Sequence, residues 1–251
     1  MEHLKRTLKN CIIAAFWLGL WAVLALAVDK PLLLPGPFAV LTRLMDLAAS
    51  AEFWTTTART LLRTSLGLLC AVPAGVLLAS VTCRFRFLHA LLSPLLTIVQ
   101  STPVASFILL LLIWLGRDIL PSVIVALMVL PVVWRNVSSG VENTDKQLLE
   151  LAKIYKFSPG RTMKRIYIPS VAPYFFAAVR TCLGLAWKAG VAAEVLTVPK
   201  GSVGQMLYES KLYLETVDLF AWTVTVILCS LIIEKLLGAA ISRLEKGDNE
   251  K

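Results

Sequence analysis

Long apolar segments alternate with short polar ones along almost the whole chain. Each apolar segment is close to the ~20 residues that an α-helix needs to cross a bilayer. The third segment is interrupted by polar residues, and the fourth is short. The pattern therefore predicts an all-α integral membrane protein with about six transmembrane helices. The expected segments are Cys11 to Val28, Leu61 to Val81, Leu91 to Leu115, Ile119 to Trp134, Val171 to Leu196 and Leu219 to Ile241.

The composition argues against a water-soluble fold. Residues from the set AVILMFWYC make up 57% of the chain, only 16% are charged, and the mean hydropathy is +0.75. Soluble domains are roughly 45–50% apolar even when glycine is counted. We expect one transmembrane domain over residues 1–251, with a core at about 55–243. The net charge is +9, and the basic residues lie between apolar segments. We therefore expect them to face the anionic lipid bilayer and expect no nucleic-acid partner.

The distribution of basic residues predicts the orientation. Lysine and arginine are retained on the cytoplasmic side of a membrane. If the N-terminus is inside, most of the 25 basic residues fall in cytoplasmic segments, whereas those of the outer loops are nearly balanced by acidic residues. We therefore expect both termini, and the segment from Arg135 to Pro169, to lie in the cytoplasm.

The first apolar segment has a competing interpretation. Lys5, Arg6 and Lys9 precede a run that ends in Ala25-Leu26-Ala27, which is the pattern of a cleavable signal peptide. The run is long for such a signal. Cleavage would leave the topology of the remaining helices unchanged.

The polar segment at residues 136–169 carries the most specific pattern. Apolar residues recur there at helical spacing and charged residues occupy other faces, which predicts a short amphipathic helix. Ser158-Pro159-Gly160 is expected to end this helix, because proline lacks the amide donor and disfavours helix in the preceding residue. A second short helix is expected from Arg161 to Tyr167. Such a pair would form a knob that another protein could bind, or would rest on the lipid headgroups.

The spacing within this segment resembles a family signature. Glu150-Leu151-Ala152, then Lys156 after three residues and Ile166-Tyr167-Ile168-Pro169 after nine more, resembles the "EAA" motif (EAA, three residues, G, nine residues, I-x-LP) of the membrane subunits of binding-protein-dependent ABC importers. Leu151 replaces the middle alanine, and Lys156 stands where the family usually has glycine. Because a lysine can remain helical, we expect the turn to be shifted toward Ser158-Pro159-Gly160.

The resemblance implies a fold, a set of partners and a location. The fold would be type I ABC importer permease-like, with a cytoplasmic coupling helix between helices 4 and 5 that docks on the ATPase. The partners would be two copies of an ABC ATPase subunit, a second permease copy (a homodimer by default) and an extracytoplasmic solute-binding protein. The location would be the bacterial cytoplasmic (inner) membrane. The resemblance assigns ATPase coupling to Glu150, Leu151, Ala152, Tyr155, Lys156, Phe157, Ser158, Pro159, Gly160 and Arg161.

Shorter motifs resemble the nitrate, sulfonate and taurine branch of the same superfamily. They include Leu34-Pro35-Gly36-Pro37 after the first helix, Ser65-Leu66-Gly67 in the second, and Arg180 with Trp187 in the fifth. This resemblance implies a small anionic solute such as a sulfonate, taurine or nitrate, while related proteins also carry bicarbonate or thiamine precursors. Specificity is expected to lie mainly in the binding protein.

Charged and polar residues inside the apolar segments are candidates for the translocation path. A charge at the bilayer centre costs about 2.5–3.5 kcal/mol, so these residues should face a protein interior or an aqueous path, although those near the helix ends could reach an interface. Lys188 is near mid-membrane, and we expect it to line the path or to hold a gate through a carboxylate or carbonyl of a neighbouring helix. The proline in the third segment predicts a hinge, a polar lining or merely a kink. The candidates are Gln100, Ser101, Thr102, Pro103, Arg180, Lys188 and Glu194.

The sequence contains no motif of an enzyme. It has no GxxxxGK[ST], HExxH or GxSxG pattern, two histidines and five cysteines without a CxxC pair. We therefore expect no catalytic residues, no cofactor and no metal site, and we expect ATP hydrolysis to take place in a partner. The alternative functions are a secondary transporter or channel that acts without an ATPase, for which inverted repeats would be expected, and an intramembrane enzyme.

Overall fold

The computed structural model describes residues 2–249, with side chains described at Lys9 and residues 11–243. The regular elements of the described chain are all helices, with no strand among them, which confirms the all-α class. The predicted cytoplasmic ends, Met1 and Lys251, lie outside the described residues. The helices are α1 (Glu2–Val28), α2 (Pro37–Ala48), α3 (Ala51–Arg84), α4 (Arg86–Ser101), α5 (Val104–Leu111), α6 (Leu120–Glu142), α7 (Lys146–Ile154), α8 (Pro159–Thr162), the π-helical turn η1 (Met163–Tyr167), α9 (Ile168–Thr197), α10 (Val203–Leu212) and α11 (Thr216–Asn249).

The described helices account for the predicted spans. Five are long and apolar enough to cross a membrane, and the bent pair α4 and α5 makes six if it is counted as one span. The predicted third segment, Leu91 to Leu115, is divided: its two helices meet at an angle of 102°. The break lies at Thr102 and Pro103, where the backbone is extended and proline has no amide to donate. The polar run from Gln100 to Pro103 therefore marks a corner between helices.

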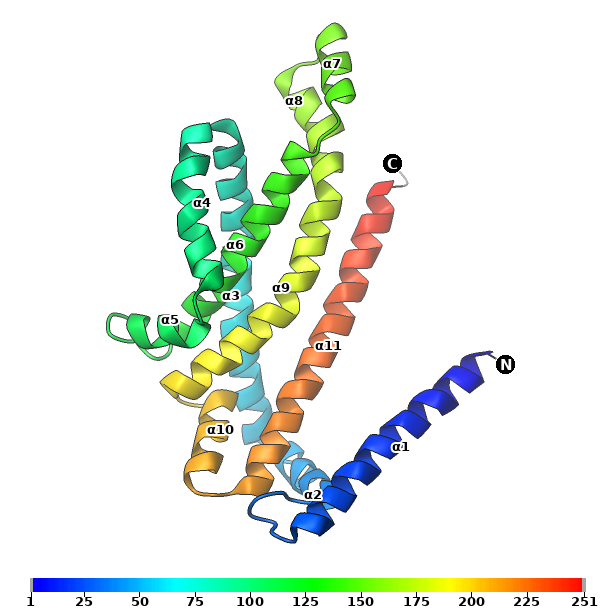
Figure 1. Ribbon diagram of the computed structural model, residues 1–251, viewed down its shortest axis with the longest axis vertical. Helices are drawn as coiled ribbons and strands as arrows, with labels where there is room; N and C mark the ends of the chain where they lie inside the picture. Colours follow the sequence, from blue (N-terminus) through cyan, green and yellow to red (C-terminus); the bar gives the residue numbers. More distant parts are fainter. Residues whose placement is uncertain (1, 250–251) are drawn as a thin grey trace.

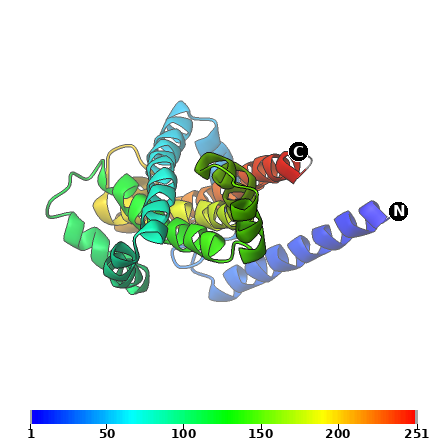
Figure 2. The same ribbon diagram turned by 90° about the horizontal axis from the view of Figure 1, so that it is seen from above.

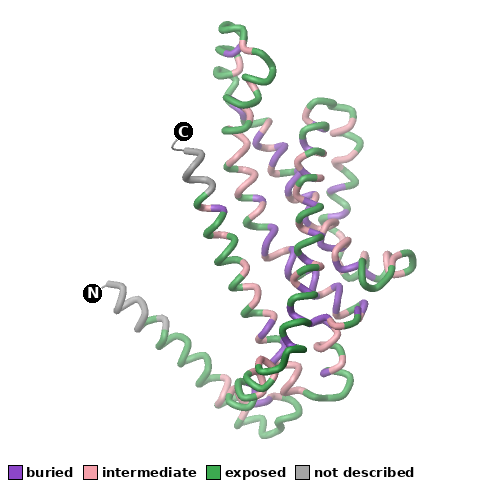
Figure 3. The backbone as a smooth tube through the Cα atoms, turned by 180° about the vertical axis from the view of Figure 1, so that it is seen from behind, coloured by how far each residue is buried: buried purple, intermediate pink, exposed green. Residues whose placement is uncertain are grey.

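The core lies where α3, α6 and α9 pack together (Figures 1 and 3). Small residues on α3 let α6 approach closely, as is common between membrane helices. A Cβ atom added at Gly75 would lie 2.8 Å from Cβ of Val133, and one at Gly67 would meet the Ser122 carbonyl oxygen. The centre of the bundle is thus fixed by backbone proximity.

The N-terminal helices lie at the edge of this core. α1 diverges from the bundle in both ribbon views (Figures 1 and 2), and its described side chains are largely exposed. Near its end, the Trp21 indole donates to the Pro35 carbonyl at 3.1 Å and stacks on Phe220 at 6.0 Å. α2 is joined to α11 by Arg43, which donates to both carboxylate oxygens of Asp218 at 2.6 and 2.7 Å.

Candidate functional site

The predicted knob is present at one end of the molecule. Helices α7 and α8 project beyond the ends of α6 and α9 (Figure 1), and we call residues 145–162 the knob. Asp145 caps α7 by accepting from the Gln147 amide at 2.7 Å, and Ser158 caps α8 by accepting from the Arg161 amide at 3.4 Å. The N-terminus of each short helix is therefore stabilised by a hydrogen bond between residues close in the sequence.

The turn that ends α7 lies at Lys156. This lysine has a φ of +52°, in the left-handed region that favours glycine. The Phe157 amide donates to the Ala152 carbonyl at 2.8 Å and the Lys156 amide to the Lys153 carbonyl at 3.1 Å, which is the Schellman pattern of a helix end. The prediction that the turn would shift to Ser158-Pro159-Gly160 is therefore wrong. Lys156 adopts the backbone conformation that the glycine of the family motif would favour.

The second knob helix also differs from its predicted range of Arg161 to Tyr167. Ser158 starts α8, with Pro159 in its first turn, where a missing amide costs nothing. The chain then continues through η1 into α9 without a stop at Pro169. Just before this proline the Ile168 amide donates to the Met163 carbonyl, five residues back, in the π-helical turn. The knob is thus continuous with a long membrane helix.

The apolar face of α7 is left open by the rest of the chain. Ala152 is buried, but Leu151 is 47% exposed, Ile154 73% and Tyr155 71%. Glu150 is exposed beside them, and the Arg161 guanidinium lies 5.4 Å from the Phe157 ring centre. The knob therefore presents apolar and charged groups together on an exposed surface.

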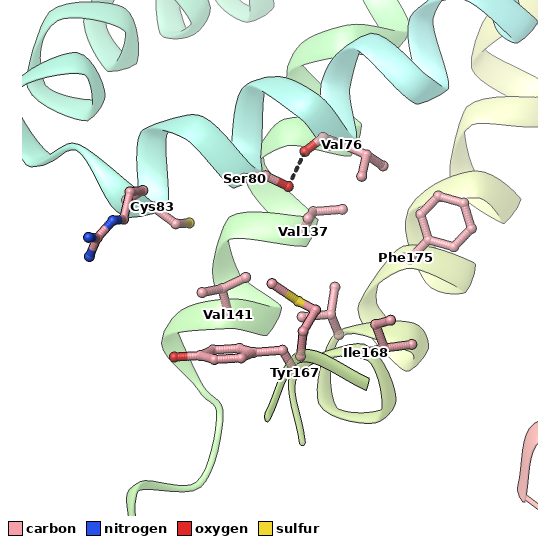
Figure 4. Close-up of a pocket in the computed structure, with 11 residues that line it drawn as sticks. Val76, Ser80, Cys83, Val137, Val141, Tyr167, Ile168 and Phe175 are labelled. Atoms are coloured by element: carbon pink, nitrogen blue, oxygen red, sulfur yellow. Dashed lines mark hydrogen bonds between the residues drawn. The ribbon is translucent and has the colours of Figure 1, made fainter. Parts of the chain in front are cut away.

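A cavity of about 500 Å³ lies at the base of the knob, between α3, α6 and the start of α9 (Figure 4). Its wall is mainly apolar, with the Ser80 hydroxyl and the Cys83 thiol on the α3 side. The π-helical turn η1 contributes Met163 and Tyr167. Such turns often occur at functional sites in helices. The junction between knob and bundle thus combines an irregular turn with space around it.

Glu194 lies at the other end of α9 and is 1% exposed. Its Oε2 accepts from the Thr60 hydroxyl at 2.8 Å and from the Gly204 amide at 3.3 Å, and its Oε1 accepts from Arg63 at 3.4 Å. The Thr60 oxygen accepts in turn from the Val203 amide at 3.0 Å. One carboxylate therefore joins α3, α9 and α10, and it is enclosed in protein rather than extended to an interface.

Two neighbours complete this network. Arg63 also donates to Asp118 at 3.0 Å and to the Lys200 carbonyl at 3.4 Å, so its charge is shared between two carboxylates. Gly204 is required by the close approach of α10, since a Cβ there would collide with the backbone and Cβ of Glu194. We call Glu194, Thr60, Arg63 and Gly204 the Glu194 cluster.

The other candidates for the path lie elsewhere. Arg180 and Lys188 are exposed on α9, and Arg180 donates to the Ser242 hydroxyl at 3.2 Å. The hydroxyls of Ser101 and Thr102 donate to the Ile98 carbonyl at 3.1 and 2.8 Å, at the corner between α4 and α5. The structure therefore places these residues in separate parts of the bundle.

Sequence reasoning missed several residues that the structure brings forward. Arg63, which is not among the predicted residues of the path, lies on α3 and binds Glu194. Thr60 and Gly204 carry no motif, so no signal in a single sequence identifies them. Glu234, a carboxylate within the last apolar segment, could have been found by the reasoning that singled out Lys188.

Comparison with known proteins gives consistent matches. Residues 71–246, more than half of the chain, match the family model described as "Binding-protein-dependent transport system inner membrane component". The SsuC protein of Bacillus subtilis (strain 168), whose name assigns it provisionally to aliphatic sulfonates transport, is 24% identical over 241 residues, which are 95% of this chain and 86% of that protein. The taurine transport system permease protein TauC of Escherichia coli (strain K12) is 24% identical, covering 89% of this chain and 83% of its own length.

A solved structure has the same fold. The crystal structure of a bacterial alginate ABC transporter, in complex with an alginate pentasaccharide-bound periplasmic protein, contains a chain that matches with a TM-score of 0.64. The two chains are 15% identical, and the match covers 96% of this chain and 98% of that one. At this identity the likeness concerns the fold, and it confirms the predicted type I importer architecture.

Proposed function

This chain belongs to the family of binding-protein-dependent transport system inner membrane components, among the sulfonate and taurine permeases, and from that membership we propose that its knob couples it to an ATPase. It is the permease of an ABC importer and not itself an enzyme. Two ATPase subunits would bind the knobs of two permease copies, which form a homodimer by default. An external binding protein would deliver a small anionic solute, in keeping with the relatives named for sulfonates and taurine.

The observation that carries this proposal is the exposed, locally capped knob. Its apolar side chains, Ile154 and Tyr155, are more than two-thirds exposed at the tip of the molecule. Exposed apolar groups with charges beside them are typical of a surface that another protein covers. The sequence around Lys156 gives this knob the spacing of the family's coupling motif.

The structure also supplies a path for movement. The knob passes through η1 directly into α9, a helix of 30 residues that is about 45 Å long. A displacement of the knob would therefore move the N-terminal end of α9, the helix that also carries Lys188 and Glu194. Binding and hydrolysis of ATP in the partner would in this way alternate access to the solute.

We further propose that the knob and both termini lie in the cytoplasm and that α10 lies outside. The basic residues of the sequence support this orientation. Single cysteines can test it, since Tyr155 in the knob and Tyr213 after α10 are 71% and 68% exposed. In intact cells whose native cysteines have been replaced, an impermeant thiol reagent should label Tyr213→Cys and leave Tyr155→Cys unlabelled. The opposite labelling would contradict the orientation.

Copurification tests the coupling role. Alanine at Glu150, Phe157 and Arg161 together should lower recovery of the ATPase on a tagged permease about tenfold or more, since each tenfold corresponds to about 1.4 kcal/mol. The matched control replaces a carboxylate, an aromatic ring and a cation at the other end: Glu215, Tyr213 and Lys211, all exposed. Undiminished recovery with the knob variant, or equal loss with the control, would overturn the proposal.

A further inference from the structure

The seam between α9 and α11 contains charged side chains within apolar segments. Lys188 lies on α9 and Glu234 on α11, and both are exposed at the surface of the isolated chain. A charge in such a position is unfavourable unless a partner or water offsets the loss of its hydration. Among the described side chains, Lys188 makes no hydrogen bond or ion pair, and Glu234 accepts one hydrogen bond, from the Ser230 hydroxyl at 3.3 Å. Both charges therefore call for a further partner.

The carboxylate of Glu234 is seated against the backbone of α9. A Cβ atom added at Gly184 would lie 2.7 Å from Glu234 Oε1, so the absence of a side chain at Gly184 makes room for the carboxylate. The Glu234 carboxylate is thereby held beside α9, in a position that the glycine leaves open.

Lys188 is placed to reach this carboxylate. It lies one helical turn after Gly184, about 6 Å along the axis. Side chains on an α-helix incline toward its N-terminus, so the four-carbon chain of Lys188 extends back over Gly184. Arg180, one turn before Gly184, inclines in the same direction and therefore away from Gly184, in agreement with its hydrogen bond to Ser242. The Lys188 side chain therefore inclines toward the part of the seam where the Glu234 carboxylate lies against Gly184.

We propose that the Lys188 ammonium is an anion-binding site that exchanges the Glu234 carboxylate for the negatively charged oxygens of a small solute. The inference rests on the proposed function, because it takes the solute to be anionic. An anion that crosses the apolar part of the membrane loses its hydration, and a cation beside its path offsets the free-energy cost of that loss. Lys188 supplies that cation on an exposed face of α9, and the nearby Glu234 carboxylate competes with the solute for it. Ser230 remains hydrogen-bonded to Glu234 while the lysine binds the solute.

Binding of methanesulfonate to the purified permease–ATPase complex in detergent tests the exchange, with the uncharged methanesulfonamide as the control ligand. The readout is the ligand-dependent rise in unfolding temperature, which reports Kd through binding to the folded state. Glu234→Gln removes the competing carboxylate, and its Kd should fall about five- to tenfold below that of the wild type. Gly184→Ala displaces the Glu234 carboxylate from its position against α9 and should also lower the Kd for methanesulfonate, by a smaller factor. Methanesulfonamide should have no effect on any variant.

Removal of the lysine should abolish the response. Lys188→Met and the double variant Lys188→Met/Glu234→Gln should show no rise with methanesulfonate, whereas Lys235→Met, which removes the same charge from the next position on α11, should respond as the wild type does. An equal response in the wild type and Lys188→Met, a weaker one in Glu234→Gln, or no response in any variant would overturn the inference. Recovery of the ATPase is measured on the same preparations and tests the proposed function separately. The proposed function fails only if that recovery does not depend on the knob.

Discussion

Glu194 is 1% exposed and binds groups from two other helices, α3 and α10, whereas Ile154 and Tyr155 in the knob are 73% and 71% exposed, and the knob helices begin with local caps. The two regions lie at opposite ends of α9 (Figure 1). At the α10 end, segments far apart in the sequence are fixed to one another by a buried carboxylate. At the knob, neighbouring residues fix one another and the outward face is open.

The difference separates stability from partner binding. A buried polar network loses several kcal/mol when one member is removed, because its partners are left unsatisfied in a low-dielectric interior. Exposed residues contribute little to folding, so their chemistry is available for another protein. Substitutions at the Glu194 cluster should therefore lower the stability of the fold, and substitutions in the knob should leave its stability unchanged but weaken binding of its partner.

The largest effect is expected at Glu194 itself. Glu194→Ala leaves Thr60, Arg63 and the Gly204 amide without their acceptor and should lower the free energy of unfolding in detergent by about 3–5 kcal/mol. Glu150→Ala removes a carboxylate from the knob and should change it by less than about 0.5 kcal/mol. Equal losses in the two variants would remove the distinction between the regions.

A pair of glycines gives the next largest contrast. At Gly204 an added methyl group meets the Glu194 backbone, and Gly204→Ala should destabilise the chain by about 1–3 kcal/mol. At Gly160 nothing lies within 4 Å, and Gly160→Ala should be neutral or slightly stabilising, since alanine is the better helix former. Thermal unfolding of both variants checks this, and an undiminished unfolding temperature in Gly204→Ala would show that α10 packs less tightly against Glu194 than the contacts at Gly204 indicate.

Lys156 offers a test within the knob. Lys156→Gly relieves a left-handed lysine and should stabilise the end of α7 by about 0.5–1 kcal/mol, after the entropy that glycine loses on folding. Lys153→Gly, inside α7, should instead destabilise it by about 1 kcal/mol. Hydrogen exchange of the α7 amides measures both changes. If the α7 amides exchanged more slowly in Lys153→Gly than in Lys156→Gly, this would contradict a left-handed turn at Lys156.

The smallest effect is expected at the ion pair between α2 and α11. The hydrogen bond to Asp218 raises the pKa of the Arg43 guanidinium above its ordinary value. A raised pKa gives stability that is present below the unfolded-state value and is lost only at extreme alkaline pH. Arg43→Met should therefore cost about 0.5 kcal/mol for a partly exposed pair, equally at about pH 6 and pH 9. Arg117→Met, at an exposed site, should lower the stability less. A loss of stability in Arg43→Met that grows between these pH values would exclude this account.

Regular features of the fold were predictable from the sequence. The apolar segments gave the spans, and the spacing around Glu150 located the knob, because both depend on residues close in the chain. The left-handed turn at Lys156 was not predicted, because lysine favours helix, although the glycine that the family motif has at this position was a signal for it. The hydrogen bonds of the folded helix end impose that conformation.

The Glu194 cluster depended on tertiary structure. Thr60 and Glu194 are 134 positions apart, and no periodicity in the sequence indicates that they meet. Intramembrane position did single out Glu194 as a residue that needs a partner. The corner at Pro103 was indicated by proline, but its 102° angle follows from the packing of α5 against α9.

Cross-linking to the ATPase tests the central claim most directly. In a background without native cysteines, Tyr155→Cys and Tyr213→Cys place single thiols on similarly exposed tyrosines in the knob and near α10. A short reagent that joins the introduced thiol to a lysine amine, applied to membranes that contain the whole transporter, should link the ATPase subunit to Tyr155→Cys and leave Tyr213→Cys without a link to it. A cross-link to the ATPase from Tyr213→Cys, with none from Tyr155→Cys, would contradict the account.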